Sequence, residues 1–84
     1  MNNYFEDIKE KLSREIKLEQ IEVIDNSKKH QHHKFFVKDK YHLHLKIKSQ
    51  YLQSITRLNA QKIIMRVLKQ DLKSKIHALE ISIE

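Results

Sequence analysis

The sequence contains no glycine and no proline in its 84 residues. Loops that cradle phosphate groups need glycine, because its missing side chain lets the backbone approach a ligand closely or adopt a positive φ angle. The chain therefore cannot form a Walker-type loop or a dinucleotide-binding loop. It also lacks the glycine loop with which some RNA-binding domains clamp the nucleic-acid backbone.

The length and composition predict one small soluble domain, residues 1–84. A chain of this size forms one hydrophobic core and buries about 60% of its unfolded surface. A hydrophobic content of 39% permits folding if the apolar residues are well patterned. The absence of cysteine excludes disulfides, cysteine nucleophiles and thiolate metal ligands from this chain. No stretch approaches the length of a membrane span and the N-terminus has no apolar signal core, so we expect a cytoplasmic protein without membrane contact.

The net charge of +6 is distributed unevenly. Residues 1–25 contain four Lys or Arg and seven Asp or Glu, a net charge of −3. Residues 26–77 contain thirteen Lys or Arg and two Asp or Glu, a net charge of +11. The last seven residues contribute a charge of −2. A basic middle favours a nucleic acid or an acidic protein surface as partner, and a solvated lysine-rich face explains it equally well.

Changes in hydrophobic periodicity predict the first two elements. Over residues 5–16, apolar side chains recur every three or four positions, which is the stripe of an amphipathic helix. Asn2 or Asn3 can cap this helix. Residues 19–25 are then rich in β-branched side chains and run into a polar stop at residues 25–27, so they predict a strand.

The rest of the chain predicts a further strand, helices and a final strand. Residues 28–41 are rich in Lys and His and predict a loop, and the strict alternation over residues 42–48 predicts a strand. A helical turn at residues 51–56 precedes a helix that Asn59 can cap and whose buried stripe spans residues 63–72. The last residues alternate again and predict a strand. The order αββααβ predicts an α+β fold, a three-stranded sheet with helices packed on one face.

Six histidines are a high number for this length. They are His30, His32 and His33 in the predicted loop, His42 and His44 on the outer side of the predicted strand, and His77 on the in-facing side at the head of the last strand. Imidazole is a common metal ligand, and the shared side of His42 and His44 suits a metal clip. Solvent exposure is the more common explanation for the loop and strand histidines, and a hydrogen-bonded structural role is the more common one for a lone His77.

Catalysis finds little support in the sequence. No serine comes with a glycine elbow or a recognisable order of base and acid. The carboxylates lie mainly in the first helix and at the chain ends, with only Asp39 and Asp71 in the basic middle, which is typical of surface solubility. The paired-histidine helix motif of hydrolytic zinc sites is absent. We therefore expect a binding protein and not an enzyme.

Three segments, in order, resemble the BolA family. Residues 25–30, Asp-Asn-Ser-Lys-Lys-His, resemble the family's Asp-x-Ser-x-x-His turn. Residues 42–49, His-Leu-His-Leu-Lys-Ile-Lys-Ser, resemble its second strand, with a leading histidine and a closing serine. Residues 67–79 resemble its helix end followed by His-Ala-Leu. The resemblance covers nearly the whole chain and implies the αββααβ topology, which is related to class II KH domains.

The resemblance also implies a function and a site. Proteins of the BolA family partner monothiol glutaredoxins and share a [2Fe–2S] cluster with them. The family's ligands carry over as His77 and His30, and His32 or His33 can substitute for His30 in the same loop. A partner cysteine and a glutathione thiol would supply the other two of the four ligands. A non-enzymatic role in iron–sulfur trafficking or in iron and redox sensing is therefore expected.

The alternative function is that of a DNA-binding transcriptional regulator, because residues 26–77 carry a net charge of +11 and the predicted helix pair resembles a helix-turn-helix. Members of the family have also been linked to DNA binding. The side chains that would then contact phosphates are Lys62, Arg66, Lys69 and Lys73. The oligomeric state stays open, including a homodimer of the isolated domain.

The sequence departs from the family pattern at three places. Residues 60–62 read Ala-Gln-Lys where the family usually has Arg-His-Arg, and residues 52–54 read Leu-Gln-Ser in place of Phe-x-Gly. The loop between His30 and His42 is a few residues longer than usual and has lost its glycine and proline. These changes leave the expected ligands in place.

Overall fold

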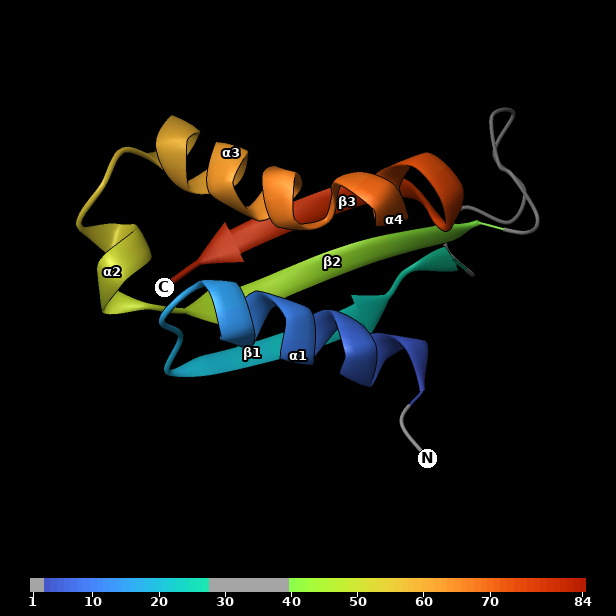
Figure 1. Cartoon of the computed structure of the whole chain (residues 1–84), viewed down its shortest axis with the longest axis horizontal. Helices are drawn as coiled ribbons and strands as arrows, with labels where there is room; N and C mark the ends of the chain where they lie inside the picture. Colours follow the sequence, from blue (N-terminus) through green and yellow to red (C-terminus); the bar gives the residue numbers. More distant parts are fainter. Residues whose placement is uncertain (1–2, 28–39) are drawn as a thin grey trace.

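The computed structural model describes residues 3–27 and 40–84. Its elements are α1 (Tyr4–Glu15), β1 (Gln20–Asp25), β2 (Tyr41–Lys48), α2 (Gln50–Gln53), α3 (Arg57–Val67), α4 (Lys69–Ser74) and β3 (Ile76–Ile83) (Figure 1). The predicted α+β fold is confirmed, except that the single long helix is divided into α3 and α4, which meet at Leu68. None of the described helices has the length and apolar character needed to cross a membrane.

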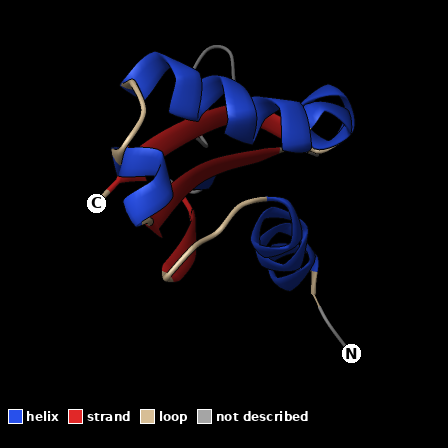
Figure 2. Cartoon of the chain, turned by 60° about the vertical axis from the view of Figure 1, so that its left-hand side comes forward, coloured by secondary structure: helices blue, strands red, loops and turns tan. Residues whose placement is uncertain are grey.

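The three strands form one sheet in the order β1-β2-β3. β1 pairs antiparallel with β2, and β2 pairs parallel with β3. A parallel pair needs a crossover connection, which helices α2, α3 and α4 supply here. Helices α1 and α3 contact each other over the sheet, and no described helix covers the sheet's opposite face (Figure 2).

Leucine and isoleucine side chains from the sheet and the helices form the core. On β2, Leu43, Leu45 and Ile47 are at most 2% exposed, as their alternation predicted. They pack with Ile8, Leu12, Ile16, Leu52, Ala60, Ile64, Leu68 and Ile76. Burial of one such large side chain contributes about 1.5–3 kcal/mol, so this apolar cluster is the main force that holds the helices on the sheet.

Side-chain caps fix where the helices begin. Asn3 caps α1, because its side chain accepts a hydrogen bond of 2.9 Å from the backbone N–H of Glu6. Ser49 caps α2, close to the predicted helical turn. The prediction that Asn59 caps the long helix is wrong. Thr56 is the cap, and its hydroxyl accepts from the backbone N–H of Asn59 at 3.1 Å, so the helix begins three residues earlier than expected.

The absence of glycine is visible in the backbone. No described residue has a positive φ angle. Many helices end at a left-handed residue, commonly glycine. In contrast, α1 ends at Ile16, which is extended (φ −132°, ψ 138°) and donates its N–H to the carbonyl of Leu12 at 2.8 Å. The chain therefore leaves the helix in an extended conformation and leads directly toward β1.

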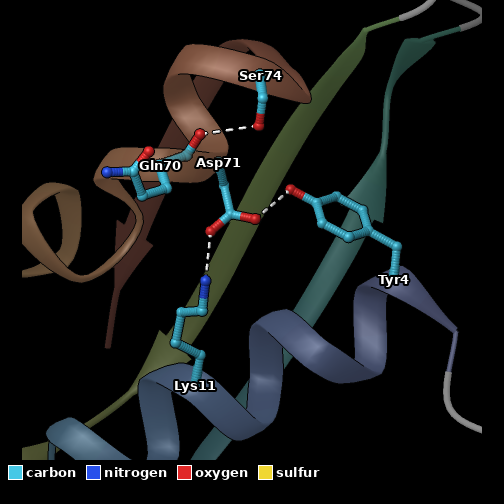
Figure 3. Close-up of polar contacts among 5 residues, drawn as sticks. All are labelled: Tyr4, Lys11, Gln70, Asp71 and Ser74. Carbon is cyan, nitrogen blue, oxygen red and sulfur yellow. Dashed lines mark hydrogen bonds and ion pairs between the residues drawn. The ribbon is translucent and has the colours of Figure 1, made fainter.

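A polar network joins α1 to α4 (Figure 3). Asp71 of α4, which is 9% exposed, accepts hydrogen bonds from the hydroxyl of Tyr4 at 2.8 Å and from the ammonium of Lys11 at 2.7 Å. Within α4, the hydroxyl of Ser74 donates to the carbonyl of Gln70 at 2.9 Å. The network ties the first helix to the segment that leads into β3.

The ionisation of Asp71 and Tyr4 follows from this network. Burial alone would raise the pKa of Asp71, but the hydrogen bonds from Lys11 and Tyr4 and the charge of Lys11 outweigh it and hold the pKa below its ordinary value of 3.8. Burial, followed by the hydrogen bond to Asp71 and the charge of Asp71, raises the pKa of Tyr4 above its ordinary value. At neutral pH the network therefore contains a carboxylate and a neutral phenol.

Candidate functional site

His77 lies at the start of β3, and its side chain is exposed. The pairing of β2 with β3 shifts at this point. Tyr41 pairs with Ile76, but the next residue on β2, His42, pairs with Ala78. His77 is therefore the extra residue of a bulge.

The bulge corrects the predicted orientation of His77. Strict alternation with Leu79 placed His77 on the in-facing side of the strand. One extra residue reverses the alternation, because side chains change sides at every position of a strand. As a result Ile76, which is 1% exposed, and Leu79 both pack in or against the core, while His77 between them is exposed.

His42 is the neighbour of His77 across the two strands. The centroids of the two imidazole rings lie 5.1 Å apart, with an angle of 55° between the ring planes. The expectation that His42 is exposed is wrong, because only 6% of its surface is exposed. Its backbone N–H donates to the hydroxyl of Ser27 at 3.2 Å, and its carbonyl accepts from the N–H of Asn26 at 2.7 Å. The residues that follow β1 thus hold the backbone of His42 in place, next to the exposed ring of His77.

A hollow of about 260 Å³ opens beside this histidine pair. It is lined by Asn26, His42, Leu43, Ala78, Leu79 and Glu80. Ala78 pairs directly with His42, and its side chain ends at Cβ, so it leaves room over the strand surface. A group from a binding partner can therefore approach β2 and β3 close to the two imidazoles.

His44 has different surroundings from His42, although both belong to β2. Its Nε2 lies 2.7 Å from the hydroxyl of Ser82, and its Nδ1 lies 3.3 Å from a carboxylate oxygen of Glu80. Both ring nitrogens of His44 are thus engaged with β3. Because both nitrogens of His44 already have partners, the structure does not favour a metal clip formed by His42 and His44.

The described residues do not form a complete metal centre by themselves. Among residues 3–27 and 40–84, no group of three or more His, Cys, Asp or Glu side chains could hold a metal ion. The expected loop ligands His30, His32 and His33 lie outside the described residues. Any metal group held at His77 would therefore need ligands from that loop or from another molecule.

Aromatic packing supports this end of the sheet from the helical side. The ring of Tyr41 stacks on Tyr4 of α1, with centroids 5.3 Å apart and 19° between the planes, and meets the edge of Phe5 at 5.3 Å. The N–H of Tyr41 donates to the carbonyl of Lys75 at 2.8 Å, and the ammonium of Lys75 lies 4.8 Å from the centre of the Tyr4 ring. Tyr41 is the first residue of β2 and Lys75 immediately precedes β3, so this packing fixes the backbone that carries the histidine pair. No pattern in the sequence indicated this cluster.

The cations expected to contact phosphates are all on the solvent side of α3 and α4. Lys62, Arg66, Lys69 and Lys73 are exposed. This placement agrees with the requirement for contact with an anionic partner, whichever class of molecule that partner belongs to.

The family model of BolA-like proteins matches residues 12–84. The chain belongs to the BolA-like family. The match includes β1, β2, the whole crossover and β3, and it therefore includes both His42 and His77.

Solved structures of BolA-like proteins agree with this membership. The BolA domain of SufE1 from Arabidopsis thaliana matches with a TM-score of 0.79 and 28% identity, covering 100% of this chain and 93% of that chain. BolA1 from Arabidopsis thaliana matches with a TM-score of 0.81 and 22% identity, covering 99% of this chain and 92% of that chain. BolA1 from Mus musculus matches with a TM-score of 0.75 and 20% identity, covering 98% of this chain and 64% of that chain. The last two support the fold alone. No protein of curated function matches the sequence significantly.

Proposed function

We propose that this BolA-like protein is a non-enzymatic partner of a monothiol glutaredoxin and shares a [2Fe–2S] cluster with it. The observation that carries the proposal is the exposure of His77 at the bulge of β3, with the imidazole of His42 5.1 Å away and a hollow beside the pair. An exposed ligand at the head of a strand can take part in a site that is completed by a second molecule. Such a shared cluster suits transfer between proteins or sensing of iron and redox state.

The donor chemistry of the chain fits a shared cluster. A [2Fe–2S] cluster takes four ligands, usually thiolates, and imidazoles can replace two of them. This chain has no cysteine and six histidines, so it can offer imidazole but no thiolate. A cysteine of the partner and the thiol of glutathione would complete the set.

The second ligand of the chain is expected from the segment between β1 and β2. His30 follows Ser27 by three residues in the sequence and lies outside the described residues. Ser27 itself is hydrogen-bonded to His42, the neighbour of His77. The proposed second ligand is therefore the histidine nearest in sequence to Ser27, which is His30, and His32 and His33 are the alternatives a few residues further on.

The test is reconstitution of the complex. The chain is mixed with a monothiol glutaredoxin, iron, sulfide and glutathione, and visible absorption and circular dichroism report the cluster. We expect a spectrum that differs from that of the glutaredoxin alone and that His77→Ala abolishes. His44→Ala is the matched control, because His44 lies on the same strand pair but is engaged with Ser82 and Glu80. An unchanged spectrum for His77→Ala would show that His77 is not a ligand.

A second candidate function is DNA binding, and one observation favours it. The four cations Lys62, Arg66, Lys69 and Lys73 are exposed together on α3 and α4. If all four contact phosphates, the logarithm of the binding constant should fall with the logarithm of salt concentration with a slope of about −3.6. Lys62→Gln/Lys69→Gln should reduce that slope by about 2. Absence of binding at low salt would exclude this function.

A further inference from the structure

The solvent side of α3 carries large apolar side chains as well as cations. In the described part of the chain, three large hydrophobic residues are exposed, and two of them, Leu58 (62% exposed) and Met65 (46%), belong to α3. Single exposed apolar residues are normal on a protein surface. These two are seven residues apart, which places them two helical turns from each other on the same side of the helix.

Cations alternate with these apolar residues. Leu58, Lys62 and Met65 follow each other on α3 at spacings of four and three, the spacing of one stripe along a helix. Lys69 follows four residues after Met65, at the start of α4, and all four residues are exposed. We call this set the α3 stripe. No Asp or Glu occurs in the sequence between Asp39 and Asp71, so no carboxylate of the helix neutralises the stripe.

A hollow continues the α3 stripe at the N-terminal end of the helix. It measures about 290 Å³ and is lined by Leu52, Gln53, Ile55, Arg57 and Ile83. Its lining is apolar except for Gln53 and Arg57, and Arg57 immediately precedes Leu58. Ile83 is the last residue of β3, whereas His77 lies near its first, so the hollow and the histidine pair are at opposite ends of the sheet.

We propose that the α3 stripe docks an acidic amphipathic helix of a partner protein. A helix that carries leucine-type anchors and glutamates at the same spacing would bury Leu58 and Met65 and pair its carboxylates with Lys62 and Lys69. The positive charge of the stripe favours an acidic partner. Leu58 and Met65 favour a protein over a nucleic acid, because their side chains cannot donate hydrogen bonds to phosphate oxygens. Methionine is also enriched at protein interfaces. Since His77 is at the other end of the sheet, both surfaces can be occupied at the same time.

The test uses defined probes. These are a synthetic helical peptide with leucine and glutamate at matching spacing, a scrambled peptide of the same composition, a DNA duplex, and phosphatidylglycerol vesicles. Binding is measured by fluorescence anisotropy for the peptides and the DNA and by co-sedimentation for the vesicles. The variants are Leu58→Gln/Met65→Gln, which removes the apolar anchors, Lys62→Gln/Lys69→Gln, which removes the charges, and Lys46→Gln/Lys48→Gln, which removes two exposed charges from β2 as a control.

We expect the matched peptide to bind more tightly than the scrambled one. Loss of the apolar anchors should weaken this binding about tenfold or more, while DNA binding changes less than about twofold. The charge variant should weaken both, and the β2 control should leave peptide binding unchanged. All substituted positions are exposed, so far-ultraviolet circular dichroism should confirm that each variant is folded.

Four results would overturn the proposal. Equal binding of matched and scrambled peptides would show that the α3 stripe attracts any negatively charged peptide, whatever the spacing of its residues. Binding of DNA with no binding of peptide would assign the surface to nucleic acid. Vesicle binding that depends on Leu58 and Met65, without peptide binding, would assign it to an anionic membrane. Self-association of the free chain that disappears in the apolar variant would make a second copy the occupant.

Discussion

The network around Asp71 leads to the most specific prediction on stability. Asp71→Asn keeps the size of the side chain and removes its charge. The bond from the Tyr4 hydroxyl then becomes one between neutral groups and loses about 1 kcal/mol, because hydrogen bonds to charged groups contribute about 1.5–3 kcal/mol and neutral ones about half of that. The ion pair with Lys11 adds only about 0–1 kcal/mol, since the Lys11 side chain is 41% exposed.

The expected loss for Asp71→Asn is therefore about 1.5 kcal/mol, or about 6–12 °C in Tm for a domain of this size. Urea denaturation at pH 7 measures it. Tyr4→Phe should cost a similar amount and Lys11→Gln less than about 1 kcal/mol. The double variant Tyr4→Phe/Asp71→Asn should cost less than the sum of the two single variants, because one weakens and the other removes the same hydrogen bond.

The pH dependence provides an independent check. The pKa of Asp71 is depressed in the folded state, so its stabilisation is present above the unfolded pKa of about 4 and is lost as the pH falls below it. The difference between wild type and Asp71→Asn should therefore shrink at pH 3. The pKa of Tyr4 is raised in the folded state, so stability should fall above about pH 10 in the wild type and fall less in Tyr4→Phe. Additive effects of the two substitutions at pH 7, or a larger cost for Lys11→Gln than for Tyr4→Phe, would refute the reasoning.

Three further substitutions test the fold and the site. Thr56→Ala should cost about 1 kcal/mol as the loss of a helix cap and Asn59→Ala much less, and equal costs in urea denaturation would contradict the assigned start of α3. Leu45→Ala, at a residue with no exposed surface on the central strand, should cost about 2–5 kcal/mol in urea denaturation, and a loss well below this range would contradict the place of Leu45 in the core. His77→Ala should change stability by less than about 0.5 kcal/mol, since the side chain is exposed, and a large loss would indicate a structural role in place of a ligand role.

Local patterns in the sequence were sufficient for the elements and the core. The alternation of Leu43, Leu45 and Ile47 predicted a strand with one buried side, and these residues are at most 2% exposed. This succeeded because side chains of a strand change sides at every residue, so the pattern needs no knowledge of neighbouring strands. The cap of α3 was misplaced because Thr56 and Asn59 are both good capping residues, and only the backbone conformation distinguishes them.

The surroundings of the histidines could not be predicted in the same way. The exposure of His77 and the burial of His42 depend on how β2 and β3 pair, and these two residues are far apart in the sequence. The partner of Asp71 was equally hidden, because its hydrogen bond with Tyr4 spans 67 positions. In the sequence, Asp71 stands out only as an isolated carboxylate in a basic region. That position indicates that Asp71 is unusual, but it does not indicate which residues Asp71 contacts.

The bulge at His77 makes the number of residues at the head of β3 as important as their identity. Deletion of a single residue between Ile76 and Leu79 would allow regular pairing with β2 and leave one outward position there, where the bulge now presents two exposed residues, His77 and Ala78. In an engineered version of this scaffold, shortening the strand would therefore remove either the imidazole or the small side chain beside it, whereas replacement of the imidazole keeps both positions. The spacing of Ile76 and Leu79 therefore sets how many side chains β3 presents to solvent between two residues that pack against the core.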